Sequence, residues 1–372
     1  MNASWIPWQL REALWSTLDW RERAAARRAF LSICRWSGEG IRTDFGGILD
    51  DGRPIHGGAV KLLPLREAFG AGDGPFNILY AVSSCQPRCA EQLFEKCRNE
   101  GIRIVWNQNG VAYPAWAGSE SERFNRPMRR LREMADFVVN QSEFCEVSAK
   151  RFLGPCDKPS AILYNPVDLV AFSPLSGREG SDSGSVRLLA AGTHGTRDRV
   201  TCVLDALREL RAGGIDATLT VAGNFQWSGG EEDFVRESER LGIANSVQRT
   251  PRFSQSDAPA LYRNHDLLLH PKYMDPCPTV VLEALACGLP VVGSMSGGMP
   301  ELVPETCGTL IEAPLDWDIR HTPSGLQIAD AVAALLPRLG EVSAAARRHA
   351  EARFAVGPWV GAHGTIFRSL PT

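Results

Sequence analysis

The second half of the chain alternates short apolar runs with helical patterns, and this alternation is what most constrains the fold. The runs at 186–192 and 217–223 are rich in strand-forming residues, and both end in glycine. From 200 to 210, apolar side chains recur at helical spacing, and the glycines at 213–214 end that helix. The pattern then repeats, with strands predicted at 246–250, 266–270 and 290–293 and helices at 234–241, 257–264 and 278–287. Strands and helices that alternate with short joins predict a parallel sheet with helices on both faces.

The first half of the chain repeats this pattern less cleanly. Its predicted strands are 76–82, 102–106, 136–140 and 161–163, and its predicted helices are 58–69, 87–99, 120–134 and 142–153. Residues 1–40 look helical, because they carry no apolar alternation. Residues 41–56 are rich in Gly and Asp and cannot be assigned, so no strand is visible ahead of the Gly-Gly pair at 57–58.

Chain length and one Gly- and Ser-rich segment indicate two domains. A chain of 372 residues is too long for one comfortable core. Residues 174–185 have no apolar periodicity and read as a flexible linker. We therefore predict a first domain at 1–173, a second domain at 186–355 and a final segment at 356–372 that crosses back to the first domain. Two such domains would face each other across a cleft at the carboxyl ends of their strands.

Composition excludes several classes of protein. The net charge of -3 gives no reason to expect nucleic acid as a partner. No apolar run is long enough to span a membrane, and the first residues do not resemble a signal peptide, so we expect a cytoplasmic protein. The ten cysteines and seven histidines show no metal-ligand spacing, so we predict no metal site and mostly buried, reduced thiols.

The stretch "HPKYMDPCPTVVLEALACGLPVV" at 270–292 holds the strongest functional signal. Asp275 precedes a helix start at Pro278, Glu283 lies in the second turn of that helix, and Gly288 is its expected end. A helix N-terminus favours a phosphate or carboxylate, and carboxylates suit a ligand dense in hydroxyls, such as a sugar or a ribose. Taken alone, each acid also suits an ordinary helix residue; together with the turn at Gly297–Gly298, they indicate a binding site.

This stretch resembles the donor-binding segment of retaining glycosyltransferases of family 4, the glycosyl transferases group 1, which have the GT-B fold. The matching residues are Pro271, Lys272, Asp275 and "EALACGLPVV" from 283, followed by "GGMPEL" at 297–302. "ILYNPVDLVAFSP" at 162–174, "ADFVVNQSEF" at 135–144 and "HGGAV" at 56–60 resemble further segments of the family and occur in the same order. The resemblance implies an α/β protein made of two doubly wound, Rossmann-like domains.

The resemblance also implies an activity and a role for each matching residue. The activity is transfer of a sugar from a nucleoside diphosphate sugar to an acceptor hydroxyl with retention, without metal or other cofactor. Asp275 would contact hydroxyls of the donor sugar, and Glu283 the ribose of the nucleotide. The other donor-side residues would be Gly192, Arg197, Arg199, Lys272, Gly297, Gly298 and Glu301, and the acceptor-side residues Gly57, Gly58 and Asn109.

The sequence departs from the family pattern at several of these positions. Thr193 and Asp198 stand where the family usually has a phosphate-binding arginine and lysine. Arg197 and Arg199 flank the second position and can supply the charge, because arginine grips phosphate bidentately; solvated loop arginines are the alternative. Lys272 replaces a serine, and Asn109 replaces a histidine, so it can hydrogen-bond a sugar but cannot act as a base.

The acceptor is expected to be a carbohydrate or a lipid-linked molecule, in surface polysaccharide or glycolipid assembly. Trp106, Tyr113 and Trp116 offer flat faces on which sugar rings can stack, although such aromatics also suit a core. Two arginine-rich stretches with aromatic residues, at 20–36 and 123–132, suggest peripheral contact with anionic lipid at the inner membrane face, although charge runs are also typical of solvated faces.

Two other functions remain open at this point. A sugar-nucleotide epimerase could use the same fold and would need no second substrate. A catalytically altered sugar-binding module would agree with the changes at Thr193, Asp198 and Asn109. The paired acids favour the transferase, since fold resemblance alone does not choose between functions.

Overall fold

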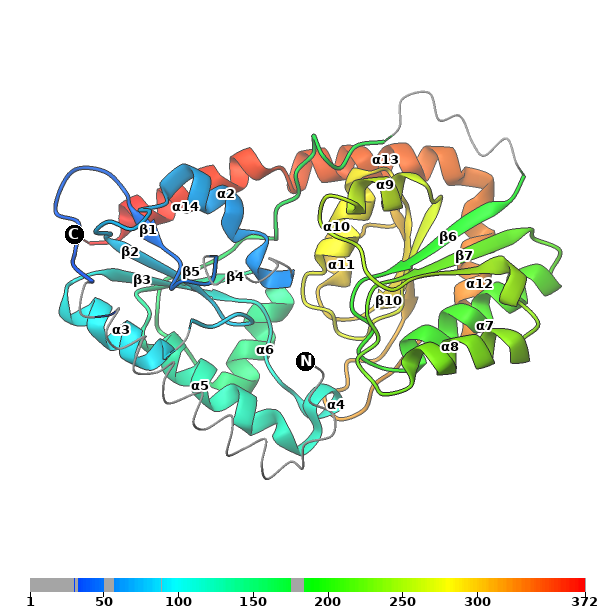
Figure 1. Ribbon diagram of the computed structural model, residues 1–372, viewed down its shortest axis with the longest axis horizontal. Coiled ribbons are helices and arrows are strands. Elements are labelled where there is room, and N and C mark those ends of the chain that lie inside the picture. The colour runs from blue at the N-terminus through cyan, green and yellow to red at the C-terminus, as the bar shows by residue number, and fades with distance from the viewer. Residues whose placement is uncertain (1–29, 31–32, 50–56, 88, 175–183, 372) are drawn as a thin grey trace.

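Two parallel sheets organise the protein (Figure 1). The computed structural model describes residues 30, 33–49, 57–87, 89–174 and 184–371. The first sheet has five strands in the order in which they occur along the chain. These strands are β1 (Thr43–Asp44), β2 (Ile78–Val82), β3 (Arg103–Gln108), β4 (Phe137–Asn140) and β5 (Ser160–Ile162). Every neighbouring pair is parallel, so each connection must cross back over the sheet.

Helices provide these connections. They are α2 (Leu62–Phe69), α3 (Ala90–Asn99), α4 (Pro114–Ala117), α5 (Ser121–Met134) and α6 (Glu143–Leu153). A short 3-10 turn at Gly57–Ala59 precedes α2. All five residues of β2 are buried, which is expected of a central strand with both faces covered.

The second sheet has six parallel strands in the order β11-β10-β9-β6-β7-β8. Its strands are β6 (Val186–Ala191), β7 (Ala217–Ala222), β8 (Val247–Thr250), β9 (Leu267–His270), β10 (Val291–Met295) and β11 (Gly308–Glu312). Its helices are α7 (Asp198–Ala212), α8 (Gly230–Arg240), α9 (Ala258–Arg263), α10 (Thr279–Ala286), α11 (Met299–Leu302), α12 (Gly325–Leu335) and α13 (Leu339–Arg353). The strand order reverses between β6 and β9. Ligands bind doubly wound sheets at such a switch point, next to the carboxyl ends of the strands.

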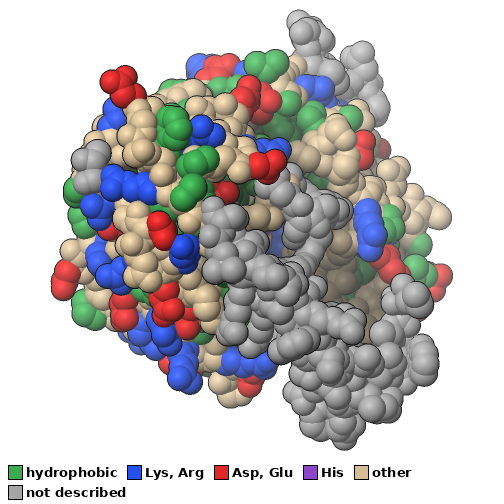
Figure 2. Space-filling view, turned by 60° about the vertical axis from the view of Figure 1, so that its left-hand side comes forward, with side chains coloured by type: hydrophobic (Ala, Val, Ile, Leu, Met, Phe, Trp, Pro, Cys, Tyr) green, Lys and Arg blue, Asp and Glu red, His purple; other side chains and the backbone are tan. Residues whose placement is uncertain are grey.

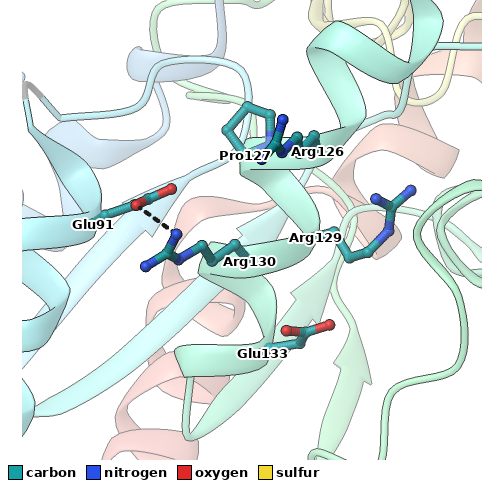
Figure 3. A pocket seen from close by; sticks show the side chains of 6 residues that line it. All are labelled: Glu91, Arg126, Pro127, Arg129, Arg130 and Glu133. Carbon is teal, nitrogen blue, oxygen red and sulfur yellow. Dashed lines mark ion pairs between the residues drawn. The ribbon is translucent and has the colours of Figure 1, made fainter.

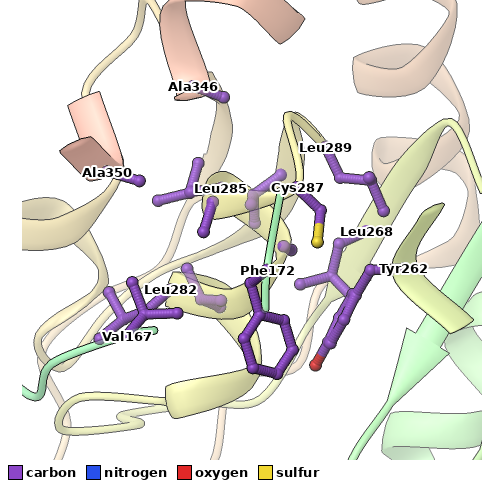
Figure 4. Close-up of a cluster of buried hydrophobic side chains, with 14 of the residues drawn as sticks. Val167, Phe172, Tyr262, Leu268, Leu282, Leu285, Cys287, Leu289, Ala346 and Ala350 are labelled. Atoms are coloured by element: carbon purple, nitrogen blue, oxygen red, sulfur yellow. The ribbon is translucent and has the colours of Figure 1, made fainter. Parts of the chain in front are cut away.

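The helix α10 is fixed on one face of the second sheet by a large apolar core (Figure 4). Leu282 and Leu285 of α10 are fully buried there. Val167 and Phe172, which lie between the two sheets in the chain, belong to the same core and pack with α10 (Figure 4). Gly288 has φ +75° and ends the helix, as predicted, because this left-handed conformation strains other residues.

The last helix, α14 (Val356–Ser369), packs on the first sheet, although it follows the second sheet in the chain (Figure 1). Trp359, Ile366 and Phe367 are buried in one core with Leu62 and Leu65 of α2. Where the chain crosses between the sheets, Val167 forms a parallel bridge with Ala355, so the two crossing segments run side by side.

The predicted α/β class with two parallel sheets is confirmed, and the second sheet, in which the strand order reverses, is doubly wound; the described strands of the first sheet follow chain order. The strand β1 lies in the stretch that the sequence pattern left unassigned, and it is only two residues long. The predicted helix over residues 1–40 is wrong at 33–40, where the described residues form no helix and Arg35 makes a parallel bridge with Phe76. Apart from residue 30, the rest of that helix lies outside the described residues, as does most of the linker at 174–185. The exact division of the chain into domains at these residues stays a prediction.

Candidate functional site

Asp275 lies in the loop that follows β9, at the switch point of the second sheet. Its side chain is buried, with 7% of its surface exposed. Its Oδ2 accepts a hydrogen bond from His270 Nε2 at 3.0 Å and lies 2.9 Å from Lys272 Nζ. Burial alone would raise the pKa of Asp275, but Lys272 and His270 outweigh it and hold the pKa well below its usual range. Asp275 is therefore a buried carboxylate that stays ionised.

His270 was not singled out from the sequence, yet it sets the orientation of Asp275. Burial lowers the pKa of His270 to about 4, so its ring is neutral at pH 7 and donates from Nε2. Within the described residues, its buried Nδ1 has no hydrogen-bond partner. The sequence signal was the polar end of an otherwise apolar strand, "LLLH".

Glu283 lies in α10 and is 4% exposed. Its Oε1 accepts from Gln255 Nε2 and its Oε2 from the Tyr262 hydroxyl, each at 2.8 Å. Burial raises the pKa of Glu283 to about 7, against the opposing effect of these two hydrogen bonds. The two hydrogen bonds thus fix the orientation of the Glu283 carboxyl group, which is only partly ionised at neutral pH.

The Gly-Gly turn at Gly297–Gly298 packs directly on the loop that carries Asp275. Gly298 N donates to Asp275 O at 2.9 Å. A Cβ on Gly298 would lie 1.9 Å from Pro276 O, and a Cβ on Gly297, which has φ +65°, would lie 2.6 Å from Asp275 O. Both positions therefore require glycine, and the turn and the acid loop form one unit.

The two candidate arginines behave differently. Arg199 is 6% exposed, and its guanidinium donates to Ala191 O and Thr193 O at 3.1 and 2.6 Å, at the carboxyl end of β6. Burial lowers the pKa of Arg199, while the carboxylate of Asp275 acts in the opposite direction. Arg197 is 63% exposed at its side chain and pairs with Asp233 at 2.7 Å. The structure thus brings Arg199, but not Arg197, into the site.

Two further donor-side positions, Gly192 and Asp198, lie close to Arg199 in the chain. Gly192 follows β6 with φ +106°, and a Cβ there would lie 3.4 Å from Val280 in α10. Asp198, at the position of the usual lysine, accepts hydrogen bonds from Arg320, at 3.1 Å, and from the Thr322 hydroxyl. Its negative charge is therefore neutralised from within the second domain.

Glu301 contacts the first domain. Its two carboxylate oxygens accept from the backbone N–H groups of Glu143 and Phe144, at 2.7 and 2.9 Å, at the N-terminus of α6. A carboxylate at this end of a helix satisfies free N–H groups and meets the positive end of the helix dipole. Glu301 thus joins the two domains beside the Gly-Gly turn.

The candidate acceptor-side residues lie beside the loop that carries Asp275. A Cβ on Gly58 would lie 2.3 Å from Ser84 Oγ and 2.8 Å from Asn109 Nδ2, so Gly58 lets these groups approach. Gly110 lies next to Pro276, since a Cβ on Gly110 would be 3.3 Å from the proline ring. This contact brings Asn109 and the Asp275 loop together. Gly57 begins the turn that carries Gly58.

The prediction that Trp106 can stack on a sugar is wrong. Trp106 is fully buried in the core of the first domain, and its Nε1 donates to Gln108. Tyr113 is also buried, and its hydroxyl donates to Met274 O at 3.3 Å. Trp116 is 57% exposed and packs against Phe124.

A groove of about 460 Å³ lies elsewhere, on the outer surface of the first domain (Figure 3). It is lined by Glu91, Arg126, Pro127, Arg129, Arg130 and Glu133. None of the candidate site residues lines it. Acids pair with its arginines, such as Glu91 with Arg130 at 3.2 Å and Glu122 with Arg129 at 2.9 Å. Basic and acidic side chains are likewise mixed on the face seen in Figure 2.

Two observations concern metals and membranes. Within residues that the structure describes, no three His, Cys, Asp or Glu side chains form a group that could hold a metal ion. Among the described helices, none combines the length and the apolar character that a membrane span requires.

Comparison with known proteins supports the assignment of the second domain. The family model for glycosyl transferases group 1 matches residues 175–319. D-inositol 3-phosphate glycosyltransferase of Salinispora tropica is 34% identical over 143 residues, which are 36% of this chain and 27% of that protein. The enzyme of the same name from Mycobacterium sp. (strain JLS) is 30% identical over 177 residues, 44% of this chain and 38% of that protein. The matches thus span only about a third of these relatives' length.

Solved structures resemble the whole two-domain arrangement. HepE of Anabaena in complex with UDP-glucose has a TM-score of 0.63 at 19% identity, with 79% of each chain covered. Sucrose-phosphate synthase from Thermosynechococcus elongatus also has a TM-score of 0.63, at 17% identity over 83% of this chain and 76% of that one. These likenesses show the GT-B fold.

Proposed function

Because the second domain of this chain belongs to the glycosyl transferases group 1 family, we propose that the protein is a retaining glycosyltransferase. It moves a sugar from a nucleoside diphosphate sugar to an acceptor hydroxyl. The observation that carries the proposal is the pair of buried acids, Asp275 and Glu283, at the switch point of the second sheet. Both carboxylates are buried and held by hydrogen bonds, and Asp275 also pairs with Lys272 at 2.9 Å; oxygens held in this way suit a ligand rich in hydroxyls.

Each acid suits a different part of the donor. Asp275 stays ionised, and its loop packs on the Gly-Gly turn, so it accepts from the hydroxyls of the sugar while the turn supplies backbone N–H groups. Glu283 accepts from the ribose hydroxyls, which can replace or join the donors Gln255 and Tyr262. In this arrangement the diphosphate lies between the two acids, near the N-terminus of α10.

The negative charge that develops on the leaving diphosphate needs a cation. Arg199 and Lys272 are the cations beside Asp275. Arg199 reaches the end of β6 from α7, so it takes over a charge that the family usually places at the position of Thr193 or Asp198. Preorganised charge of this kind is usually the largest contribution to catalysis at such a site. In this proposal the chemistry relies on these side chains and on no metal.

We propose a UDP-sugar as the donor. The support is the structural similarity to HepE in complex with UDP-glucose and to the pneumococcal O-GlcNAc transferase GtfA in complex with UDP and GlcNAc, the latter with a TM-score of 0.57. The acceptor is a carbohydrate or a lipid-linked molecule that enters beside Gly58 and Asn109. Surface polysaccharide or glycolipid assembly on the cytoplasmic side of a membrane is the setting that agrees with such an acceptor.

One observation favours a second candidate, a sugar-binding module without turnover. Asp198 replaces a cation, and its carboxylate is occupied by Arg320 and Thr322. Such a module would bind the UDP-sugar but would not break it down. An epimerase would convert the donor without releasing UDP, so UDP release separates the transferase from both alternatives.

The test begins with thermal unfolding in the presence of UDP-, GDP- and ADP-sugars. A ligand at a hundred times its Kd adds about 2.7 kcal/mol to stability. We expect UDP-sugars to stabilise the protein and candidate acceptors to trigger UDP release. Asp275→Asn should abolish this release, while Glu305→Gln, which changes an exposed acid in the same domain, should not. Undiminished UDP release by Asp275→Asn would contradict the proposal.

A further inference from the structure

Lys61 is a buried lysine to which the proposed function assigns no role. It follows the turn at Gly57–Ala59 and directly precedes α2. Only 6% of its surface is exposed. In the part of the chain that the structure describes, no carboxylate pairs with its ammonium group. The sequence signal was a single lysine within the apolar run "GGAVKLLPL".

Four side-chain amides surround the ammonium group, and we call them the amide cage. Their carbonyl oxygens lie 2.6 Å (Asn107), 2.7 Å (Asn109), 3.1 Å (Asn165) and 3.2 Å (Gln141) from Lys61 Nζ. Asn107 lies in β3 and Asn109 just beyond it, Gln141 follows β4, and Asn165 lies where the chain leaves the first sheet. The cage is therefore at the cleft edge of the first domain.

The ammonium group decides how each amide points. It has three N–H donors and no acceptor, so it attracts the carbonyl oxygen of each amide and turns the NH2 group away. Each NH2 group then has a defined second partner. The partners are the Tyr80 hydroxyl for Asn107, Ser84 Oγ for Asn109, Asn109 O for Gln141 and Cys277 O for Asn165.

These second contacts reach both sides of the proposed active site. Asn109 is the acceptor-side amide. Lys61 holds its Oδ1, so its Nδ2 points towards Ser84 Oγ. Asn165 Nδ2 donates to Cys277 O at 2.9 Å, two residues beyond Asp275. A single ammonium group thus connects the acceptor side with the loop that carries the sugar-binding acid.

Burial of Lys61 lowers the stability of the fold, so its presence here points to a role other than stability. Burial of a charge without an opposite charge is unfavourable, and an apolar residue of similar size would avoid this cost. Burial lowers the pKa of Lys61 to about 8, which reflects the same cost. The amide cage offsets part of it by hydrogen bonding to the charged form.

We infer that Lys61 is a positioning residue for glycosyl transfer, which acts by fixing the amides of Asn109 and Asn165 on the two sides of the cleft. The inference rests on the proposed function. Lys61 would then affect the reaction through the amide cage, without direct contact with the substrate. When the ammonium loses its proton, the cage loses a donor, and one amide is free to turn.

Among the described residues, the other titratable groups that face Lys61 should not titrate between pH 7 and 9. Three thiols face it, those of Cys85, Cys145 and Cys277; burial raises the pKa of Cys145 to about 12 and moves the pKa values of the other two upward as well. One contact further, burial raises the pKa of Tyr80 far above its usual value and lowers that of His363 to about 4. Glu283 in the donor site also titrates, near pH 7, so the part of an activity loss near pH 8 that Lys61→Met removes is what reports on Lys61.

The experiment measures UDP affinity and UDP release from UDP-glucose between pH 6 and 9.5. The proteins are the wild-type chain, Lys61→Met and the control Lys96→Met, which removes a partly exposed lysine paired with Glu100. In Lys61→Met we expect UDP affinity close to wild type and turnover lower by about a hundredfold, the scale of a misplaced reacting group. The decline of wild-type activity above pH 8 should be absent in this variant. Lys96→Met should match the wild type.

A second variant keeps the inference testable if Lys61→Met does not fold. Asn165→Ala leaves the charge but removes one cage oxygen and the contact to Cys277, so turnover should fall and its alkaline decline should begin at lower pH. Wild-type turnover and an unchanged pH profile in the folded variants would overturn the inference. If the wild-type chain itself neither binds UDP nor releases it from UDP-glucose, the proposed function fails first, and the role of Lys61 fails with it.

Discussion

Replacement of Glu283 by glutamine should stabilise the protein at pH 8 but change its stability little at pH 5. Burial raises the pKa of Glu283 from 4.5 to about 7 in the folded chain. Below pH 4.5 the carboxyl is protonated in both the folded and unfolded states, and its contribution to stability is fully present. This contribution is lost as the pH rises from 4.5 through about 7, because the unfolded chain ionises first and the folded chain must then hold a buried charge.

The magnitude follows from the same pKa values. One pKa unit corresponds to 1.36 kcal/mol, so the rise from 4.5 to about 7 amounts to about 3 kcal/mol in total, most of it lost between pH 5 and pH 8. Glutamine does not titrate, and it can keep a hydrogen bond with the Tyr262 hydroxyl. The free energy of unfolding of Glu283→Gln, relative to wild type, should therefore increase by roughly this amount over the interval.

Guanidinium chloride unfolding at pH 5, 6, 7 and 8, followed by circular dichroism, measures this difference. Glu305→Gln is the matched control, because it removes an exposed acid from the same domain. A difference between Glu283→Gln and wild type that is the same at every pH would refute the reasoning. So would an equal trend in the control. Saturating UDP should reduce the difference, since ribose hydroxyls favour the ionised carboxylate.

Two further predictions concern the charge and the backbone of the site. Arg199→Met should weaken UDP binding by about 1.5–3 kcal/mol, the usual value of a hydrogen bond to a charged group. Arg197→Met should leave UDP binding unchanged. Equal affinities of the two variants in calorimetry would contradict the assignment of Arg199. Gly298→Ala should lower the Tm, because its Cβ would clash with Pro276 O, whereas Gly361→Ala, in open space within α14, should add about 0.5–1 kcal/mol. A wild-type Tm for Gly298→Ala would show that the turn is looser than described.

The second sheet could be predicted from β6 to β10, because its signals are local, whereas β11 and the helices α12 and α13 were not predicted. Most of these strands are short apolar runs, although β8 reads "VQRT". The glycines after β6 and β7 adopt positive φ, which few other residues tolerate. The first sheet was harder to predict. β1 has two residues, Thr43 and Asp44, which is too short for any periodicity. Trp106 was misjudged because a tryptophan among amides looks like a sugar platform, although its ring is core.

The site residues divide in the same way. Asp275, Glu283 and the Gly-Gly turn lie within one stretch of sequence, and their order along the chain was enough to find them. Lys61 meets Asn165 across 104 positions, and Glu301 meets Phe144 across 157. The first contact forms within the first domain and the second between the two domains, but both join residues far apart in the chain, so no local pattern could indicate them. The sequence could show that Arg197 and Arg199 were candidates, but only the fold could separate them.

The position of α14 has a consequence for how the chain becomes folded as it is made. The core of the first sheet includes Trp359, Ile366 and Phe367 together with Leu62, Leu65 and Tyr80. A ribosome releases residues 57–162, with all but the first strand of this sheet, long before it releases residues 356–369. During that interval the apolar surface of α2 lacks its cover, while the second sheet, whose own strands and helices lie between 186 and 353, can be completed first. The first domain to be synthesised is therefore the last to be finished, and its exposed apolar face is the part of the nascent chain most in need of a chaperone.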